Sequence, residues 1–128
     1  MKPQVLVIDD CADARKLIHM ILSPRGYVTW EAEDAVQAFE LLKVERFDLV
    51  VIDIAMIGID GFTIASEIRH GHVGPLNRDA FLVGCTALYL DKKNVSKDST
   101  GMDLFFRKPL GVREFANKID ALMGRVAV

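Results

Sequence analysis

The sequence has little of what marks secreted, membrane-spanning or strongly charged proteins. Its 128 residues include two cysteines, which is too few for a disulfide scaffold and fits a reducing compartment. No apolar run approaches the roughly 20 residues of a membrane-spanning helix, and the first one, at residues 5–8, is too short for a signal-peptide core. The formal net charge of −2 gives no reason to expect direct binding to nucleic acid or to an anionic membrane. We therefore expect a cytoplasmic protein without membrane insertion.

Internal repeats, low-complexity tracts and long linkers are also absent from the sequence. A hydrophobic share of 51% and a charged share of 27% are ordinary for a globular protein. A chain of this length can bury a core without disulfides or metal ions to support it. We expect residues 1–128 to form a single domain.

Short apolar runs alternate with segments of helical periodicity along the whole chain. Asp34 and Asp60 precede two of the periodic segments and are expected to cap helices. The apolar runs predict five strands, at residues 4–8, 27–30, 49–52, 81–85 and 104–106. The periodic segments predict five helices, at residues 12–22, 35–42, 62–68, 89–99 and 112–123. The glycines and proline of residues 70–78 predict a solvated loop.

This alternation indicates an α/β fold. Five strands joined through helices form a parallel sheet covered on both faces, because right-handed crossovers place the helices over it. For this length we expect a flavodoxin-like, doubly wound five-stranded parallel sheet of order 2-1-3-4-5 with five helices. In such sheets the functional crevice lies at the carboxyl ends of the strands, where strands 1 and 3 meet.

Polar side chains follow the ends of the strands that border this crevice. Each alone has an ordinary structural interpretation, since an aspartate after a strand often caps a helix. Their occurrence at four strand ends is improbable by chance and indicates a common site. They are Asp9 and Asp10 after the first strand, Asp53 after the third, Thr86 and Ala87 after the fourth, and Lys108 and Pro109 after the fifth.

Three neighbouring carboxylates repel one another, and a hard cation is one way to hold them ionised. Mg²⁺ prefers oxygen ligands and binds through a few carboxylates together with substrate phosphate, so Asp9, Asp10 and Asp53 predict a magnesium site. A carboxylate held there can attack a phosphoryl group and form an aspartyl phosphate. The metal, Lys108 and the Thr86 hydroxyl could neutralise the phosphoryl oxygens.

In order and approximate spacing, these residues resemble the receiver domain of two-component response regulators, the CheY-like family. The resemblance covers essentially the whole chain. It rests on the acid pair Asp9-Asp10, Asp53 within DLVVIDIAM, Asp60-Gly61, Thr86-Ala87 and Lys108-Pro109.

The resemblance implies a role for each carboxylate. It makes Asp53 the phosphoacceptor. It also implies that Mg²⁺, or Mn²⁺, binds directly to Asp10, to Asp53 and to the backbone carbonyl of Ala55. Asp9 would assist through a water molecule.

The resemblance also assigns the residues that would handle the phosphoryl group. Thr86 and Ala87 would bind its oxygens and Lys108 would pair with its charge. Pro109 would give the following loop a cis or a trans geometry. Phe105 matches the aromatic switch position, and we expect it to turn into the space that Thr86 leaves on activation.

A member of this family would be a phosphoacceptor signalling module. It would take a phosphoryl group from a phosphohistidine on a sensor histidine kinase or a histidine phosphotransfer protein. It would catalyse only its own phosphorylation and dephosphorylation and so would not be an enzyme in the usual sense. The surface of the fourth helix, fifth strand and fifth helix would switch and contact an unknown output partner, and it could also form a homodimer. The chain would be a stand-alone regulator or part of a larger regulator or hybrid histidine kinase.

The chain departs from the family pattern at three positions. Ile57 stands where the family usually has proline, which frees the backbone of that loop. Ala55 and Leu88 occupy positions that tune dephosphorylation, often through polar side chains near the attacking water. Both are apolar here, and the hypothesis is a comparatively long-lived phosphoryl group.

Two other functions fit parts of the pattern. A phosphohydrolase that also forms an aspartyl phosphate needs a second aspartate two residues after the nucleophile, where this chain has Ala55. A flavodoxin-like FMN protein needs a Ser/Thr/Gly-rich phosphate loop after the first strand, where the acids at positions 9, 10 and 13 would repel the phosphate.

Overall fold

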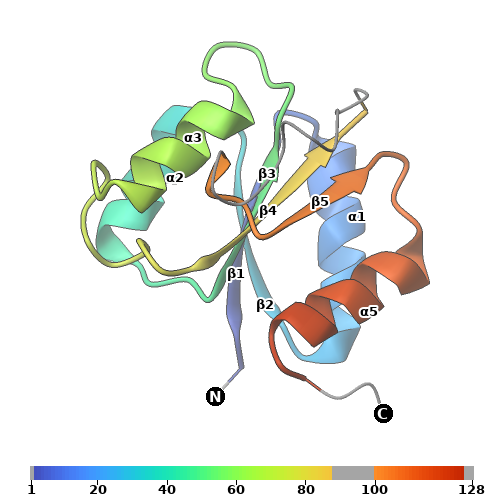
Figure 1. Cartoon of the computed structure of the whole chain (residues 1–128). Coiled ribbons are helices and arrows are strands. Elements are labelled where there is room, and N and C mark those ends of the chain that lie inside the picture. The colour runs from blue at the N-terminus through green and yellow to red at the C-terminus, as the bar shows by residue number, and fades with distance from the viewer. Residues whose placement is uncertain (1, 88–99, 126–128) are drawn as a thin grey trace.

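The computed structural model describes residues 2–87 and 100–125, and its centre is a parallel five-stranded sheet between two layers of helices (Figure 1). The strand order is β2-β1-β3-β4-β5, and every neighbouring pair is parallel. The predicted flavodoxin-like sheet is therefore confirmed. The strands are β1 (Gln4–Ile8), β2 (Val28–Ala32), β3 (Leu49–Asp53), β4 (Phe81–Thr86) and β5 (Leu104–Arg107).

The described residues contain four α-helices instead of the five expected. One pair, α1 and α5, covers one face of the sheet, and α2 and α3 cover the other (Figure 1). The helix predicted at residues 89–99 lies outside the described residues. The helices are α1 (Ala12–Leu22), α2 (Ala35–Val44), α3 (Gly61–Arg69) and α5 (Val112–Leu122), with a short 3-10 helix, η1 (Ser23–Arg25), after α1.

The central strand β3 is buried along its whole length. Side chains of a strand point to alternate faces. Leu49 and Val51 accordingly pack into the cluster under α1 and α5, while Val50 and Ile52 pack into the cluster under α2 and α3. A strand covered on both sides needs apolar residues on both, which explains the uninterrupted apolar run before Asp53.

Both predicted helix caps are confirmed. The Asp34 carboxylate accepts a hydrogen bond from the Gln37 amide at 2.8 Å, and Asp60 accepts one from the Thr63 amide at 2.9 Å. Each bond satisfies a backbone donor that the first helical turn cannot pair. Gly61 then lets α3 approach the end of β3, since a Cβ there would lie 2.7 Å from the Ile54 Cα.

Two local expectations were wrong. The second strand begins at Val28 instead of residue 27, because the Tyr27 amide closes a turn onto the Leu22 carbonyl after Gly26, whose φ is 89°. The segment 70–78 is not merely solvated, because Val73 and Asn77 are buried. Asn77 donates to the carbonyls of Leu42 and Glu45 and accepts from the Phe47 amide, so it joins this loop to the connection between α2 and β3.

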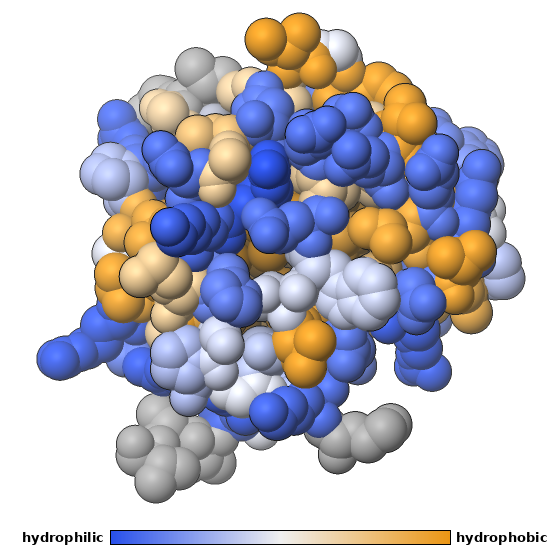
Figure 2. All heavy atoms as spheres, turned by 180° about the vertical axis from the view of Figure 1, so that it is seen from behind, coloured by the Kyte–Doolittle hydropathy of each residue, from blue (hydrophilic) through white to orange (hydrophobic). Residues whose placement is uncertain are grey.

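The surface is mixed in character. On the face shown in Figure 2, hydrophobic residues of the described part lie in small groups among hydrophilic ones. Scattered exposed apolar side chains are normal for a folded protein. No helix in the part of the chain that the structure describes is long and apolar enough to cross a membrane.

Candidate functional site

Three carboxylates meet at the carboxyl ends of β1 and β3. These strands pair with Ile8 opposite Ile52, which brings Asp9, Asp10 and Asp53 to one edge of the sheet. Carboxylate oxygens from the three residues all lie within 4.8 Å of one another. Asp9 and Asp53 are buried, with 2% and 7% of their surface exposed, whereas Asp10 is exposed. The cluster therefore opens to solvent on the Asp10 side.

Lys108, directly after β5, brings a positive charge to this cluster. Its ammonium group donates to Asp9 Oδ2 at 2.8 Å and lies 3.7 Å from Asp53 Oδ2. Its amide donates to the Thr86 carbonyl at 2.8 Å, which fixes the residue beside the end of β4. The peptide bond to Pro109 is cis, which answers the question that the sequence left open.

The charges of this cluster perturb one another. Burial and the neighbouring Asp9 carboxylate raise the pKa of Asp53, and the Lys108 ammonium only partly opposes this. Burial would lower the pKa of Lys108, but its hydrogen bond to Asp9 and the charges of Asp9 and Asp53 raise it overall. One ammonium group cannot balance three carboxylates, so the cluster suits a divalent cation with oxygen preference.

Backbone amides of the loop after β3 also face the carboxylates. The Ala55 amide donates to Asp53 Oδ1 at 3.2 Å, and the Ile57 amide lies 3.5 Å from Asp10 Oδ2, a long contact. Amides beside a carboxylate favour its charged form. Ile57 itself is 95% exposed, so the position that lacks the usual proline leaves an apolar side chain at the rim of the site.

The other predicted site residues lie at neighbouring strand ends. Thr86 is buried as the last residue of β4, directly after Cys85, which pairs with Asp53, and Ala87 follows it at the surface. Phe105 lies in β5 and packs partly buried against the cluster under α2 and α3. Leu88 lies outside the described residues.

Sequence reasoning missed the groups that hold Asp9. The Cys11 amide donates to Asp9 Oδ1 at 2.9 Å, and the Arg15 guanidinium donates to the Asp9 carbonyl at 2.7 Å. Arg15 is in turn paired with Glu31 of β2 at 3.0 Å. An arginine one turn into the helix that follows the acid pair is the only sequence signal for this contact, and it is too common to predict it.

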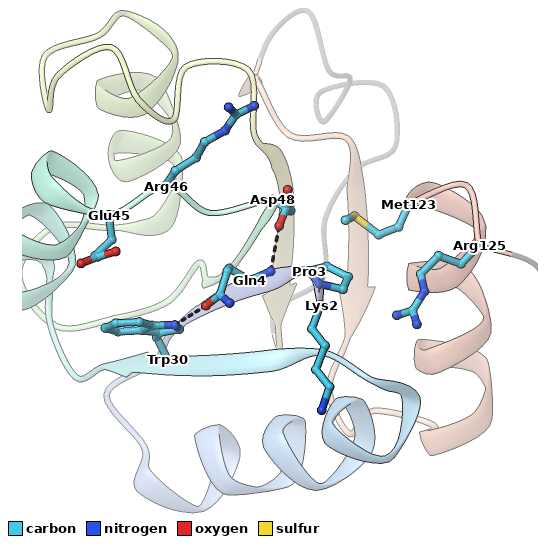
Figure 3. Close-up of a pocket in the computed structure, with 9 residues that line it drawn as sticks. All are labelled: Lys2, Pro3, Gln4, Trp30, Glu45, Arg46, Asp48, Met123 and Arg125. Carbon is cyan, nitrogen blue, oxygen red and sulfur yellow. Dashed lines mark hydrogen bonds between the residues drawn. The ribbon is translucent and has the colours of Figure 1, made fainter.

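A hollow at the opposite end of the sheet carries none of the predicted residues. This open hollow has a volume of about 960 Å³ beside the start of β1 and is lined by nine residues (Figure 3). Inside it, the Gln4 amide donates to Asp48 at 2.8 Å and the Gln4 side chain accepts from the Trp30 indole at 2.6 Å. The acids that could hold a metal lie at the other ends of the strands, so we place the functional site there.

Residues 5–120 match the family described as the response regulator receiver domain. The chain belongs to this family. It is 34% identical over 109 residues to the chemotaxis protein CheY of Halobacterium salinarum, with 85% of this chain and 87% of that protein covered. It is 32% identical over 124 residues to the probable transcriptional regulator ycf27 of Guillardia theta, with 97% of this chain and 46% of that protein covered. The receiver domain thus spans about half the length of several curated relatives it matches.

Solved structures agree with this assignment. The response regulator TrrA of Thermotoga maritima, solved in complex with Mg²⁺ and BeF, shares 30% identity and a TM-score of 0.80, with 95% of this chain and 99% of that chain covered. This chain is therefore a response regulator receiver domain of the two-component type, with an acidic cluster that could bind a metal.

Proposed function

We propose that this receiver domain accepts a phosphoryl group on Asp53 from a phosphohistidine and signals through the resulting aspartyl phosphate. The observation that carries the proposal is the convergence of Asp9, Asp10 and Asp53 within 4.8 Å, with the Lys108 ammonium 3.7 Å from Asp53. A nucleophile, a cation site and a fixed positive charge are the parts that phosphoryl transfer requires.

The metal ligands we propose are Asp10, Asp53 and the Ala55 backbone carbonyl, with Asp9 acting through water. Mg²⁺, or Mn²⁺ in its place, would supply positive charge to the phosphoryl oxygens and orient the group. The donor set fits such an ion because it consists of oxygen atoms only.

The chain's own residues perform the remaining steps. A carboxylate oxygen of Asp53 forms a bond to phosphorus as the bond between phosphorus and the donor's imidazole nitrogen breaks, and that nitrogen keeps the electron pair. Lys108 exchanges part of its contact with Asp9 for a phosphoryl oxygen. We assign a hydrogen bond to another oxygen to the Thr86 hydroxyl and the Ala87 amide. The chain catalyses only the gain and loss of its own phosphoryl group.

Phosphorylation adds roughly two negative charges beside Thr86. We propose that Thr86 and Phe105 respond and change the surface formed by the helix predicted at residues 89–99, β5 and α5. The donor would be a sensor histidine kinase or a histidine phosphotransfer protein. One relative is the hybrid signal transduction histidine kinase F of Dictyostelium discoideum, of which this chain covers 10%, and ycf27 is named a transcriptional regulator. Either arrangement would suit this module, and a homodimer through the switching face remains part of the proposal.

Phosphotransfer from a panel of histidine kinases tests the proposal. With Mg²⁺ present, we expect labelled phosphate on the wild-type chain and on an Asp79→Asn control, whose carboxylate lies at the opposite end of the sheet. Asp53→Asn should accept none, and chelation of Mg²⁺ should abolish transfer to the wild type. Equal labelling of Asp53→Asn would overturn the assignment of the acceptor.

A further inference from the structure

Gly84 lies in the middle of β4, where a glycine weakens a strand. Its backbone has no positive φ, so conformation does not require glycine at this position. Glycine fits this position because its neighbours leave no space for a side chain. A Cβ at residue 84 would lie 2.8 Å from Met102 Sδ, 2.9 Å from Ile54 Cδ1 and 2.9 Å from Phe105 Cδ1.

The aromatic ring at this contact belongs to the cross-strand neighbour of Gly84. In the pairing of β4 with β5, Gly84 lies opposite Phe105. An aromatic side chain placed over a cross-strand glycine covers the bare backbone and fixes the pairing. Phe62 of α3 also packs near this ring, with its ring centroid 6.1 Å from that of Phe105.

This contact is next to the functional site. Side chains two residues apart on a strand share a face, so position 84 lies on the same face of β4 as Thr86. Thr86 pairs with Arg107 in the same ladder, and the preceding residue, Cys85, pairs with Asp53. Phe105 is therefore separated from Asp53 by β4, and it directly precedes Phe106, whose partner Cys85 pairs with Asp53.

We propose that Gly84 is a positioning residue for Phe105. The absence of a side chain at position 84 creates a seat, formed by Gly84, Met102 and Ile54, that holds the Phe105 ring over β4 before any phosphorylation. The position of the ring is then set by residue 84 as well as by Thr86. This inference rests on the proposed signalling function, which it deepens by naming the residue that sets the resting state of Phe105.

Nuclear Overhauser contacts between the Phe105 ring and Gly84 test the seat in the free protein. We expect these contacts in the wild type, and we expect Thr86→Ala to keep them. Gly84→Ala should lose the ring's contacts with both residue 84 and Phe62. The added methyl group would also clash with Met102 and could destabilise the fold. The double variant Gly84→Ala/Met102→Ala removes that clash, and the Phe105 ring should still lose its contacts with residue 84.

Val83→Ala is the matched control, because Val83 precedes Gly84 but packs on the opposite face of the sheet. It should lower stability and leave the Phe105 contacts unchanged. The inference is overturned if the free wild type lacks the contacts, if Thr86→Ala loses them, if either Gly84 variant keeps them, or if Val83→Ala loses them. Failure of the wild type to bind beryllofluoride at Asp53 would instead count against the proposed function. The contacts between Phe105 and Gly84 would still decide whether the seat exists.

Discussion

At the scale of single residues, Lys108 shares its charge between two buried carboxylates. Its ammonium lies 2.8 Å from Asp9 and 3.7 Å from Asp53, and its charge opposes the rise in the pKa of Asp53 that burial causes. The same charge repels a divalent cation bound nearby. Lys108 therefore weakens metal binding, but it supplies the positive charge that attracts a phosphoryl group.

Because Lys108 opposes metal binding but favours phosphate, Lys108→Ala should change Mg²⁺ affinity and phosphotransfer in opposite directions. Affinity for Mg²⁺ should rise by about tenfold, or ~1.4 kcal/mol, since a competing cation is removed. Phosphotransfer to Asp53 should fall, since a phosphoryl oxygen loses its fixed partner. Isothermal titration with Mg²⁺ and a phosphotransfer assay measure the two effects. Lys118→Ala, which removes an exposed ammonium paired with Glu114 on α5, should change neither; a Mg²⁺ affinity unchanged in Lys108→Ala would contradict the argument.

Ala55 makes a second prediction at this scale. Its amide contacts Asp53, but its exposed methyl group offers no polar atom to a water that attacks the phosphoryl group. Ala55→Asn should therefore shorten the lifetime of the aspartyl phosphate several-fold, measured as loss of label after the donor is removed. Val36→Asn, an exposed apolar residue on α2, should leave the lifetime unchanged. An unaltered lifetime in Ala55→Asn would reject this explanation of the apolar residues around Asp53.

At the scale of elements, buried polar side chains join segments that are distant in sequence. Asp120 of α5 accepts from the Tyr27 hydroxyl at 2.6 Å and from the Arg25 guanidinium at 2.7 Å. Burial would raise the pKa of Asp120, but these hydrogen bonds and the arginine charge lower it overall. The contacts therefore fix the carboxyl end of α5 against the turn between α1 and β2.

The lowered pKa of Asp120 predicts a pH dependence of stability. A carboxyl with a lowered folded-state pKa stabilises the fold above its unfolded-state pKa, and this contribution is lost as the pH falls through the folded-state value. Asp120→Asn should cost about 2 kcal/mol at pH 7 and progressively less as the pH falls below about 4. Urea unfolding at several pH values measures the difference. A penalty of equal size at all pH values would exclude a contribution from the charge.

Asn77 performs a similar task in the loop before β4. All three of its side-chain hydrogen bonds go to backbone groups in the last turn of α2 and the connection to β3, and the residue is 1% exposed. Asn77→Ala should lower the free energy of unfolding by about 2–3 kcal/mol, because it leaves buried backbone groups unpaired. Asn117→Ala, at an exposed hydrogen bond to Arg25, should cost less than half as much. A similar loss for both would show that burial of the Asn77 contacts is not decisive.

These contacts mark where prediction from the sequence ends. Apolar runs and strand-end acids were sufficient to predict the sheet order and the meeting of Asp9, Asp10 and Asp53, because parallel strands bring their carboxyl ends to one edge. The caps Asp34 and Asp60 followed from local chemistry. Asn77, Arg15 and the pair of Asp120 with Tyr27 could not be predicted in this way, since their partners come from separate elements and no local periodicity connects them.

At the scale of the whole molecule, the two ends of the sheet differ, because one carries clustered carboxylates and the other carries polar groups that are hydrogen-bonded to one another. The carboxyl ends carry clustered buried charge, which destabilises the apo form because like carboxylates repel. The amino ends carry the paired groups of Gln4, Asp48 and Trp30 (Figure 3). A ligand that neutralises the carboxyl-end cluster should therefore stabilise the entire fold.

This coupling predicts that Mg²⁺ raises the unfolding temperature. An ion that binds only the folded state stabilises it by RT ln(1 + [L]/Kd), or about 2.7 kcal/mol at one hundred times Kd. The wild type should show a midpoint that rises with Mg²⁺ concentration, measured by calorimetry at constant ionic strength. Asp10→Asn and Asp53→Asn should be more stable than the wild type without Mg²⁺, because each removes one repelling charge, and should gain far less when Mg²⁺ is added. Asp13→Asn alters an exposed acid in the first turn of α1 and should respond as the wild type does. Equal gains in all four proteins would mean that the ion acts on general surface charge, and the cluster of Asp9, Asp10 and Asp53 would then not be the metal site.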